Sequence, residues 1–178
     1  MLSFNKRAQH SALRTQHYFM DHLWSPWRYQ YISSADREEG CVLCRIAAEQ
    51  NDDENHVVHR ARLNFVVLNL FPYTNGHLMI VPYEHQASLA AAGEAATTEM
   101  IELAKRAQLA LEAEYNPDGF NIGMNLGRSA GAGVADHLHL HVVPRWSGDA
   151  NFVSIVGETR VLSEDLATTC RKLKKQFE

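Results

Sequence analysis

The stretch HLHLHVVPRW, from His137 to Trp146, decides how this sequence is interpreted. Alternate side chains of a strand point to the same face, so three histidines at a spacing of two share one face. Leu138, Leu140 and Val142 share the opposite face, where we expect them to pack on a hydrophobic core. The stretch therefore predicts a strand with one face of imidazoles and one face of aliphatic side chains.

The row of three histidines favours a reaction site. Imidazole has an unperturbed pKa near neutrality, so a row of them can attack, donate protons and bind anions. Two other interpretations remain open. The histidines could be the solvent face of a half-exposed strand, or two of them could bind a metal, because His-x-His on a strand is good ligand geometry. The adjoining glycine-rich loop favours the reaction site.

That glycine-rich loop, NLGRSAGAGVAD at residues 125–136, suits the binding of an anion. Its glycines allow backbone N–H groups to approach a ligand closely and to form an anion-binding nest. The loop lacks the lysine of a Walker motif and precedes a strand, so it fits neither the Walker nor the dinucleotide-binding context. Many glycine-rich loops only turn the chain, so alone it is a weak signal.

Composition predicts an ordinary globular protein. The 178 residues are 46% hydrophobic and 21% charged, and we expect a single domain over residues 21–178 after a loosely ordered extension at residues 1–20. A net charge of −4 without a long basic run argues against nucleic-acid binding through bulk electrostatics. No apolar run reaches the roughly 18–20 residues that span a bilayer, and the N-terminus lacks the apolar core of a secretory signal. We expect a cytoplasmic protein without a membrane partner.

Hydrophobic periodicity predicts an α+β fold with a mainly antiparallel sheet. Leu63–Leu70 and His77–Pro82 are expected to form an antiparallel pair joined by the turn sequence FPYTNG. Helical spacing of apolar residues predicts a long helix over residues 94–115, ended by NPDG. Other expected elements are a short helix after Cys44, strands at FNIGMNL, at HLHLHVVP and around Val153–Val156, and a last helix capped by Ser163.

The three cysteines do not predict a disulfide framework. An odd count in a chain expected in the cytoplasm leaves metal binding or redox chemistry for Cys41 and Cys44 of CVLC. The neighbouring sequence does not show the pattern of a thioredoxin-like motif, and a tetrahedral zinc would need two more ligands. Cys170 is expected to be a thiol on the C-terminal helix that serves in helix packing.

HLHLHVV matches the signature His-φ-His-φ-His-φ-φ, where φ is hydrophobic, of the histidine triad (HIT) superfamily of nucleotide hydrolases and transferases. The segments LWSPWRYQYI, LNLFPYTNGHLMIVPYEH, GFNIGMNLG and HVVPRWSGDANF resemble the branch of bacterial diadenosine polyphosphate phosphorylases and related hydrolases. The resemblance implies an HIT-like fold with a long helix and a C-terminal helix. It also implies a homodimer formed by joining sheets across a two-fold axis.

The activity that this resemblance implies is cleavage of a dinucleoside polyphosphate, such as diadenosine tetraphosphate, at the α-phosphate, by hydrolysis or by phosphorolysis. No organic cofactor is expected. An alternative is a purine nucleoside phosphoramidase or mononucleotide hydrolase that uses the same site. A second alternative, from a different class, is a zinc-stabilised nucleotide-binding protein without turnover, against which the complete triad argues.

The resemblance implies separate roles for the histidines. His139 would attack the α-phosphate and form a covalent nucleotidyl-histidine. His141 would bind phosphate oxygens or the leaving oxygen, and His77 would support the triad from the neighbouring strand. His77 is equally consistent with a buried structural hydrogen-bonder, since most polar side chains have that plainer role.

Substrate contacts are implied for residues outside the triad. Asn69 would meet the ribose hydroxyls, although it could simply end a strand. Asn125 and the loop N–H groups from Gly131 to Gly133 would hold the phosphate charge that develops in the transition state. Many family hydrolases carry Gln at the position of Gly133. The glycine resembles the phosphorylase branch, where a freer pocket would admit inorganic phosphate in place of water.

The resemblance also supplies the missing ligands for the cysteine pair. In zinc-containing members, and in the related galactose-1-phosphate uridylyltransferases, the CxxC pair joins a histidine like that of VPYEH and the first histidine of the triad. This implies a structural zinc with all four ligand positions filled by protein, namely Cys41, Cys44, His85 and His137.

Overall fold

The computed structural model describes residues 40–149 and 162–178. The segment LWSPWRYQYI and the strand expected around Val153–Val156 lie outside these residues, as does the extension at 1–20. The division into an extension and a domain over 21–178 therefore stays a prediction. Within the described part of the chain, no helix is both long and apolar enough to cross a membrane.

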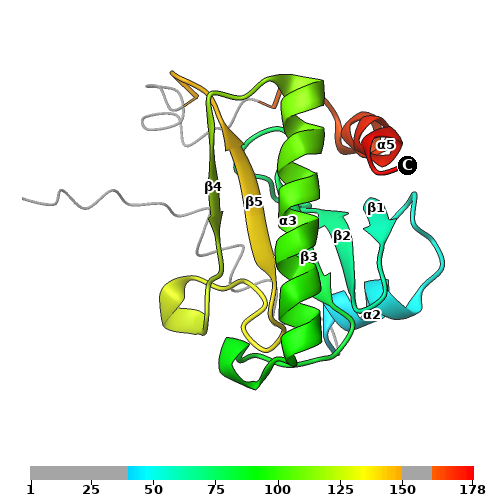
Figure 1. The fold of residues 1–178 in the computed structure, drawn as a ribbon, viewed down its shortest axis with the longest axis vertical. Helices are drawn as coiled ribbons and strands as arrows, with labels where there is room; N and C mark the ends of the chain where they lie inside the picture. The colour runs from blue at the N-terminus through cyan, green and yellow to red at the C-terminus, as the bar shows by residue number, and fades with distance from the viewer. Residues whose placement is uncertain (1–39, 150–161) are drawn as a thin grey trace, which may run out of the picture.

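A five-stranded antiparallel sheet forms the centre of the molecule, with strand order β1-β2-β3-β5-β4 (Figure 1). This confirms the predicted α+β class with a mainly antiparallel sheet. The register places Met79 opposite His141, which brings β3 beside the histidine stretch. The strands are β1 (Val57–Arg60), β2 (Asn64–Leu68), β3 (Leu78–Pro82), β4 (Gly119–Gly123) and β5 (Leu140–Arg145).

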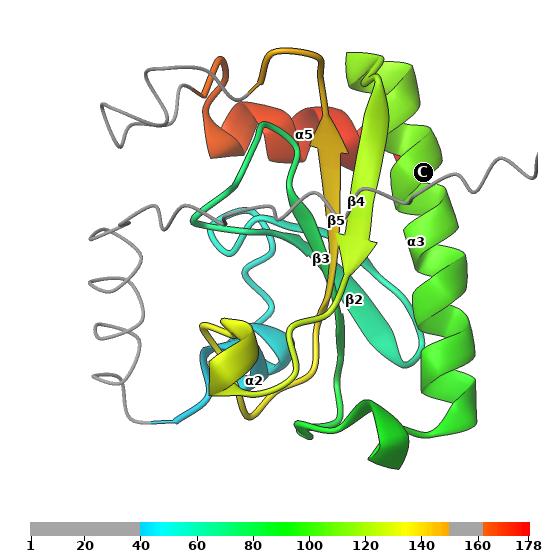
Figure 2. The same ribbon diagram turned by 90° about the vertical axis from the view of Figure 1, so that its left-hand side faces the viewer.

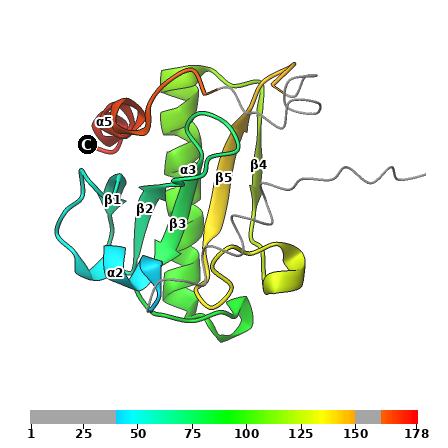
Figure 3. The same ribbon diagram turned by 180° about the vertical axis from the view of Figure 1, so that it is seen from behind.

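Helices cover both faces of the sheet. The long helix α3 (Glu94–Tyr115) lies along one face, while α2 (Val42–Ala48) and the 3₁₀ turn η3 (Arg128–Ala130) lie on the other (Figure 2). The C-terminal helix α5 (Leu166–Gln176) packs against α3 and β1, as the view from behind shows (Figure 3). The described residues also form the 3₁₀ turn η2 (Leu89–Ala91). The face that α3 leaves open is therefore bordered by α2 and the glycine-rich loop.

Two hydrophobic clusters divide the core between these faces. Alternate residues of β2 explain the division: Val66 and Leu68 face the α3 cluster, and Phe65 and Val67 face the α2 cluster. All five residues of β2 are buried, as expected for a strand covered on both sides. Cys170 of α5 lies in the α3 cluster, which confirms the expectation that its thiol is a buried packing residue of the C-terminal helix.

The β2–β3 connection places His77 at the start of β3. Gly76 has φ 76°, and a Cβ there would lie 2.7 Å from Leu111 Cδ2. Glycine is needed both for the left-handed backbone and for this close approach to α3. The predicted antiparallel pair is confirmed, with Leu68 opposite Leu78.

Some predicted boundaries were wrong. Helix α2 begins at Val42, between the two cysteines, rather than after Cys44. The N-cap of α5 is Asp165, not Ser163, because the Asp165 carboxylate accepts a hydrogen bond from the Thr168 N–H at 2.8 Å. Strand β4 ends at Gly123, before the predicted end of FNIGMNL. Strand β5 begins only at Leu140, so two of the triad histidines precede the ladder.

Candidate functional site

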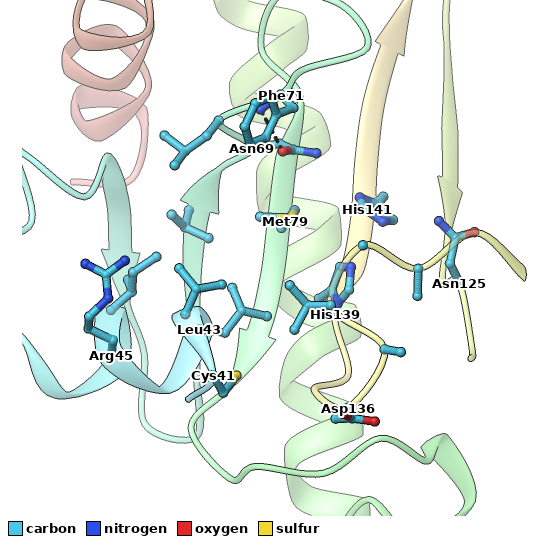
Figure 4. Close-up of a pocket in the computed structure, with 18 of the residues that line it drawn as sticks. Cys41, Leu43, Arg45, Asn69, Phe71, Met79, Asn125, Asp136, His139 and His141 are labelled. Carbon is cyan, nitrogen blue, oxygen red and sulfur yellow. Dashed lines mark hydrogen bonds between the residues drawn. The ribbon is translucent and has the colours of Figure 1, made fainter. Parts of the chain in front are cut away.

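A cavity of about 720 Å³ opens on the face of the sheet opposite α3. Helix α2, the ends of β2 and β3, and the glycine-rich loop form its walls. His139 and His141 line it together with all four predicted substrate contacts, as the close-up shows for Asn69 and Asn125 (Figure 4). Gly131 and Gly133 line it as well. The structure therefore brings the predicted substrate-binding residues and two triad histidines to one cavity.

The predicted alternation along the histidine stretch is confirmed. Leu138, Leu140 and Val142 pack in the α3 cluster, and the histidines face the other side of the sheet. The alternation begins before β5 because the chain is already extended there: the Leu138 N–H donates to the Gln86 carbonyl at 2.6 Å. The half-exposed interpretation was wrong, since His137 is fully buried and His139 is 6% exposed.

His139 presents an unprotonated ring nitrogen to the cavity. Its Nδ1 lies 2.8 Å from the His137 carbonyl oxygen, which can only accept, so Nδ1 carries the proton. Nε2 then has a lone pair. Burial lowers the pKa of His139, and the bond to the His137 carbonyl opposes this only in part. The ring is therefore neutral at pH 7, as a nitrogen nucleophile must be.

His77 is bonded so that His141 donates into the cavity. His77 Nδ1 accepts the backbone N–H of Tyr73 at 3.1 Å and lies 3.4 Å from Asn69 Nδ2. Its proton is therefore on Nε2, which lies 2.9 Å from His141 Nδ1 and donates to it. His141 in turn carries its proton on Nε2. Burial and the neighbouring His139 lower the pKa of His141 to about 4, so this donor is neutral at pH 7.

The asparagine and glycine positions differ in what they can offer a ligand. Asn69 is buried at the cavity wall, and its Oδ1 accepts the Phe71 N–H at 3.0 Å, which leaves one lone pair. The Gly131 N–H donates to the Arg128 carbonyl at 2.9 Å. Gly131 therefore closes the turn η3 in this structure, and an anion would have to use N–H groups later in the loop, from Gly133 onward.

A candidate metal centre adjoins the cavity and consists of Cys41, Cys44, His85 and His137, of which Cys41 and His85 also line the cavity. One ligand atom from each lies within 4.8 Å of the others. His137 Nδ1 is 3.3 Å from Cys41 Sγ, and His85 Nδ1 is 3.2 Å from Cys44 Sγ. These separations are near the roughly 3.5 Å between sulfur and nitrogen ligands of a tetrahedral zinc.

The second ring nitrogen of His137 supports the metal assignment. Nε2 lies 2.9 Å from the Pro82 carbonyl and must donate to it, so Nδ1 is unprotonated and faces the thiols. The same residue holds His139 through its backbone carbonyl. The candidate metal centre and the His139 ring are therefore joined through one residue.

Three charged residues at the cavity were not among the sequence predictions. Arg45, Arg128 and Asp136 line it. Each stands beside a motif, in CVLCR, GRSAG and VADHLH, so adjacency to the motifs was the available signal. The hydrogen bond from the Tyr73 backbone N–H to His77 could not be expected from the sequence, because every residue type except proline has a backbone N–H.

A model of the HIT domain matches residues 50–148, and the chain belongs to the HIT family. It is 38% identical over 165 residues to the AP-4-A phosphorylase of Mycobacterium tuberculosis, with 89% of this chain and 85% of that protein covered. It is also 29% identical over 113 residues to an uncharacterized HIT-like protein of Saccharolobus solfataricus, with 64% and 79% covered.

Solved structures confirm the HIT fold. A Zn-bound histidine triad family protein from Mycobacterium smegmatis has a TM-score of 0.63 at 27% identity, covering 77% of this chain and 92% of that one. A hypothetical histidine triad nucleotide-binding protein from Sulfolobus tokodaii has a TM-score of 0.62 at 25% identity, covering 76% and 91%.

Proposed function

We propose that this chain cleaves dinucleoside polyphosphates, of the diadenosine tetraphosphate type, through a nucleotidyl-His139 intermediate. The observation that carries the proposal is the lone pair of His139 Nε2 at the cavity, fixed by the bond from Nδ1–H to the His137 carbonyl. The 38% identity to an AP-4-A phosphorylase supports this substrate class. The enzyme is thus a nucleotide hydrolase or transferase.

In the first step, the His139 Nε2 lone pair forms a bond to the α-phosphorus, and the bond to the bridging oxygen breaks. The electron pair of that bond leaves with the polyphosphate, which is stable as an anion. His141 Nε2–H donates a hydrogen bond to a phosphate oxygen or to the leaving oxygen, whose negative charge grows in the transition state. In the second step, an oxygen of phosphate or water attacks the same phosphorus and loses its proton to solvent. The P–N bond breaks, and its electron pair restores the lone pair of His139 Nε2.

The cavity walls fit the rest of a nucleotide. Leu43, Ile46 and Val67 provide an apolar surface suited to a base, and Met79 lies beside them. Asn69 lies beside Phe71 at another end of the same cavity (Figure 4), where its remaining lone pair can accept a ribose hydroxyl. Asn125 lies beside His141 on the other side, where its amide can meet phosphate oxygens (Figure 4).

We further propose zinc as the metal of the centre formed by Cys41, Cys44, His85 and His137. Two thiolates and two imidazoles are a ligand set that zinc prefers, and all four positions are filled by protein. Such a centre is structural, because it has no open position for water. The Zn-bound relative from Mycobacterium smegmatis supports this identity.

Incubation with diadenosine tetraphosphate, with and without inorganic phosphate, tests the reaction. Chromatography should show ADP and ATP when phosphate is present, which indicates phosphorolysis. AMP and ATP in its absence would indicate that water also serves as second nucleophile. Turnover of adenosine phosphoramidate without cleavage of diadenosine tetraphosphate would replace the proposal by the phosphoramidase alternative. Nucleotide binding without turnover of either would replace it by a non-catalytic binding protein.

A matched pair of variants tests the role of His77. His77→Gln keeps an N–H that can donate to His141 Nδ1, whereas His77→Glu puts an acceptor there and reverses the proton position on His141. We expect kcat to fall by about tenfold or less in His77→Gln and by about 10²–10³-fold in His77→Glu, since one oriented donor is lost. Nitrogen NMR of the histidine rings should show His141 protonated at Nδ1 only in His77→Glu. Equal losses, with an unchanged His141 tautomer, would reduce His77 to a packing residue.

Two proposals concern the setting of the enzyme. β4 is an edge strand with Ile122 48% exposed, and Leu126 just beyond it is 46% exposed, so this edge suits a homodimer across a two-fold axis. Light scattering should give twice the 20.1 kDa chain mass, and a monomer would contradict the dimer.

Metal-binding thiols and a nucleotide substrate suit the reducing cytoplasm, which cell fractionation can check.

A further inference from the structure

Each reacting histidine offers the substrate a single ring nitrogen. His139 Nδ1 is bonded to the His137 carbonyl, and His141 Nδ1 is bonded to His77 Nε2, so only Nε2 of each ring is left for a ligand. A polyphosphate bridge carries roughly one negative charge per phosphate. Among the described residues that line the cavity, the basic side chains other than histidine are Arg45 and Arg128, and the acidic one is Asp136. Compensation of the polyphosphate charge must therefore depend on one or both arginines.

Arg45 is poorly placed for the phosphates. It lies on α2, beside the apolar residues Leu43 and Ile46. Figure 4 shows it far from His141 and Asn125, across the width of the cavity. A nucleotide whose α-phosphate meets His139 and whose base meets the apolar wall directs its other phosphates away from Arg45.

Arg128 belongs to the loop that borders the phosphate end. It follows Asn125 by three residues and begins the turn η3. The flanking residues Gly127 and Gly131 have φ of 81° and 87°, and the Gly131 N–H donates to the Arg128 carbonyl. The turn therefore fixes the backbone of an exposed arginine at the rim of the cavity. Because the Gly131 N–H is used inside the turn, Arg128 is the cationic group that this part of the loop offers.

Asp136 makes this positive charge more important. Its carboxylate lines the same cavity and lies on the side of His139 away from Asn69 (Figure 4). It repels a phosphate chain that approaches from that side. The field across the cavity thus favours a polyphosphate that leaves the α-phosphate toward the loop carrying Arg128.

We propose that the Arg128 guanidinium binds the phosphates beyond the one that His139 attacks, and afterwards binds the inorganic phosphate that takes their place. This inference rests on the proposed function. Guanidinium offers parallel N–H donors that match phosphate oxygens, which suits both anions. Arg128 would then make the site bind polyphosphate nucleotides more tightly than monophosphate nucleotides. It would also favour phosphate over water as the second nucleophile.

The binding test needs no turnover. AMP, α,β-methylene-ATP and inorganic phosphate are titrated calorimetrically against wild type, Arg128→Gln, Arg128→Lys and Arg62→Gln. Arg62 is an exposed arginine that does not line the cavity, so its replacement makes the same change in net charge. Arg128→Gln should weaken α,β-methylene-ATP by about tenfold or more, as expected for lost charge-assisted hydrogen bonds, and AMP by about twofold or less. Arg128→Lys should fall between, because lysine lacks the planar fork.

Turnover provides a second readout. In Arg128→Gln the KM for phosphate should rise by about tenfold or more, and the share of diadenosine tetraphosphate that yields AMP instead of ADP should increase. Equal weakening of AMP and α,β-methylene-ATP would overturn the proposal, and so would an equal effect of Arg62→Gln. It is also overturned if wild type binds α,β-methylene-ATP no more tightly than AMP. A wild type that cleaves no dinucleoside polyphosphate but keeps the Arg128-dependent preference would contradict the proposed function alone.

Discussion

Replacement of His139 by alanine is expected to lower kcat for diadenosine tetraphosphate by at least about 10⁴-fold. The variant loses Nε2, which is the nitrogen with a lone pair at the cavity, and no neighbouring group can replace it. His141 carries its proton on Nε2, and His77 Nε2 is engaged with His141. The loss should therefore appear in kcat, while the Kd for AMP changes little. Steady-state kinetics and calorimetry measure the two quantities.

The covalent intermediate gives this prediction a direct readout. Quenching with denaturant at alkaline pH, where the P–N bond of a nucleotidyl-histidine is stable, should leave one nucleotidyl group on the wild-type chain by intact-mass analysis, and none on His139→Ala. His139→Gly should regain part of its activity when imidazole is added, because free imidazole can occupy the vacated space and attack in its place. Wild-type turnover rates in His139→Ala would sink the proposed mechanism. Circular dichroism and metal content, unchanged in both variants, would exclude misfolding as the cause.

Long periodic segments allowed much of the fold to be predicted from sequence. Helix α3 has the predicted limits, since apolar residues recur at helical spacing through 22 residues and Asn116 ends it in the left-handed region with φ 44°. The β2–β3 pair and the two faces of the histidine stretch followed from alternation. In each case one strong period extends over many residues, so local exceptions did not alter the outcome.

Features that depend on single backbone groups could not be predicted. The proton positions on His77 and His141 follow from the Tyr73 N–H. A backbone carbonyl was the expected partner of the His139 ring N–H, but the sequence did not indicate that it is the carbonyl of His137. Backbone groups leave no trace in the residue types. The cap of α5 was misplaced for a related reason, since Ser163 and Asp165 are both good N-caps and only the position of the first helical turn decides between them.

The candidate metal ligands could be expected only from the family resemblance. Cys41 and Cys44 are close in sequence, but His85 and His137 come from two distant segments. Nothing in their spacing shows that the β3–η2 connection and the start of the histidine stretch meet. The sheet order, which places β5 beside β3, brings them together.

Removal of the metal is expected to have the second largest effect, this time on stability. Helix α2 has seven residues and no side-chain N-cap bond, which is too short to be stable alone. Metal bonds from Cys41 and Cys44 would fix α2 to His85 and His137. These bonds would add to the packing of Leu43 in the hydrophobic core. A chelator should therefore lower the Tm by about 10 °C, a loss of roughly 3 kcal/mol for a domain of this size.

Matched cysteine variants separate metal loss from general damage. Cys44→Ser should have a metal content near zero, a similarly lowered Tm, and no further response to chelator. Cys170→Ala removes a thiol from the α3 cluster and should keep one metal per chain. A wild-type stoichiometry near zero, or a Tm that chelator leaves unchanged, would remove the metal from this account. Nucleotide affinity should fall with the metal, because α2 forms a wall of the cavity and the His137 carbonyl holds the His139 ring. A metal centre with no open position would thus support the chemistry by fixing the two segments on either side of it.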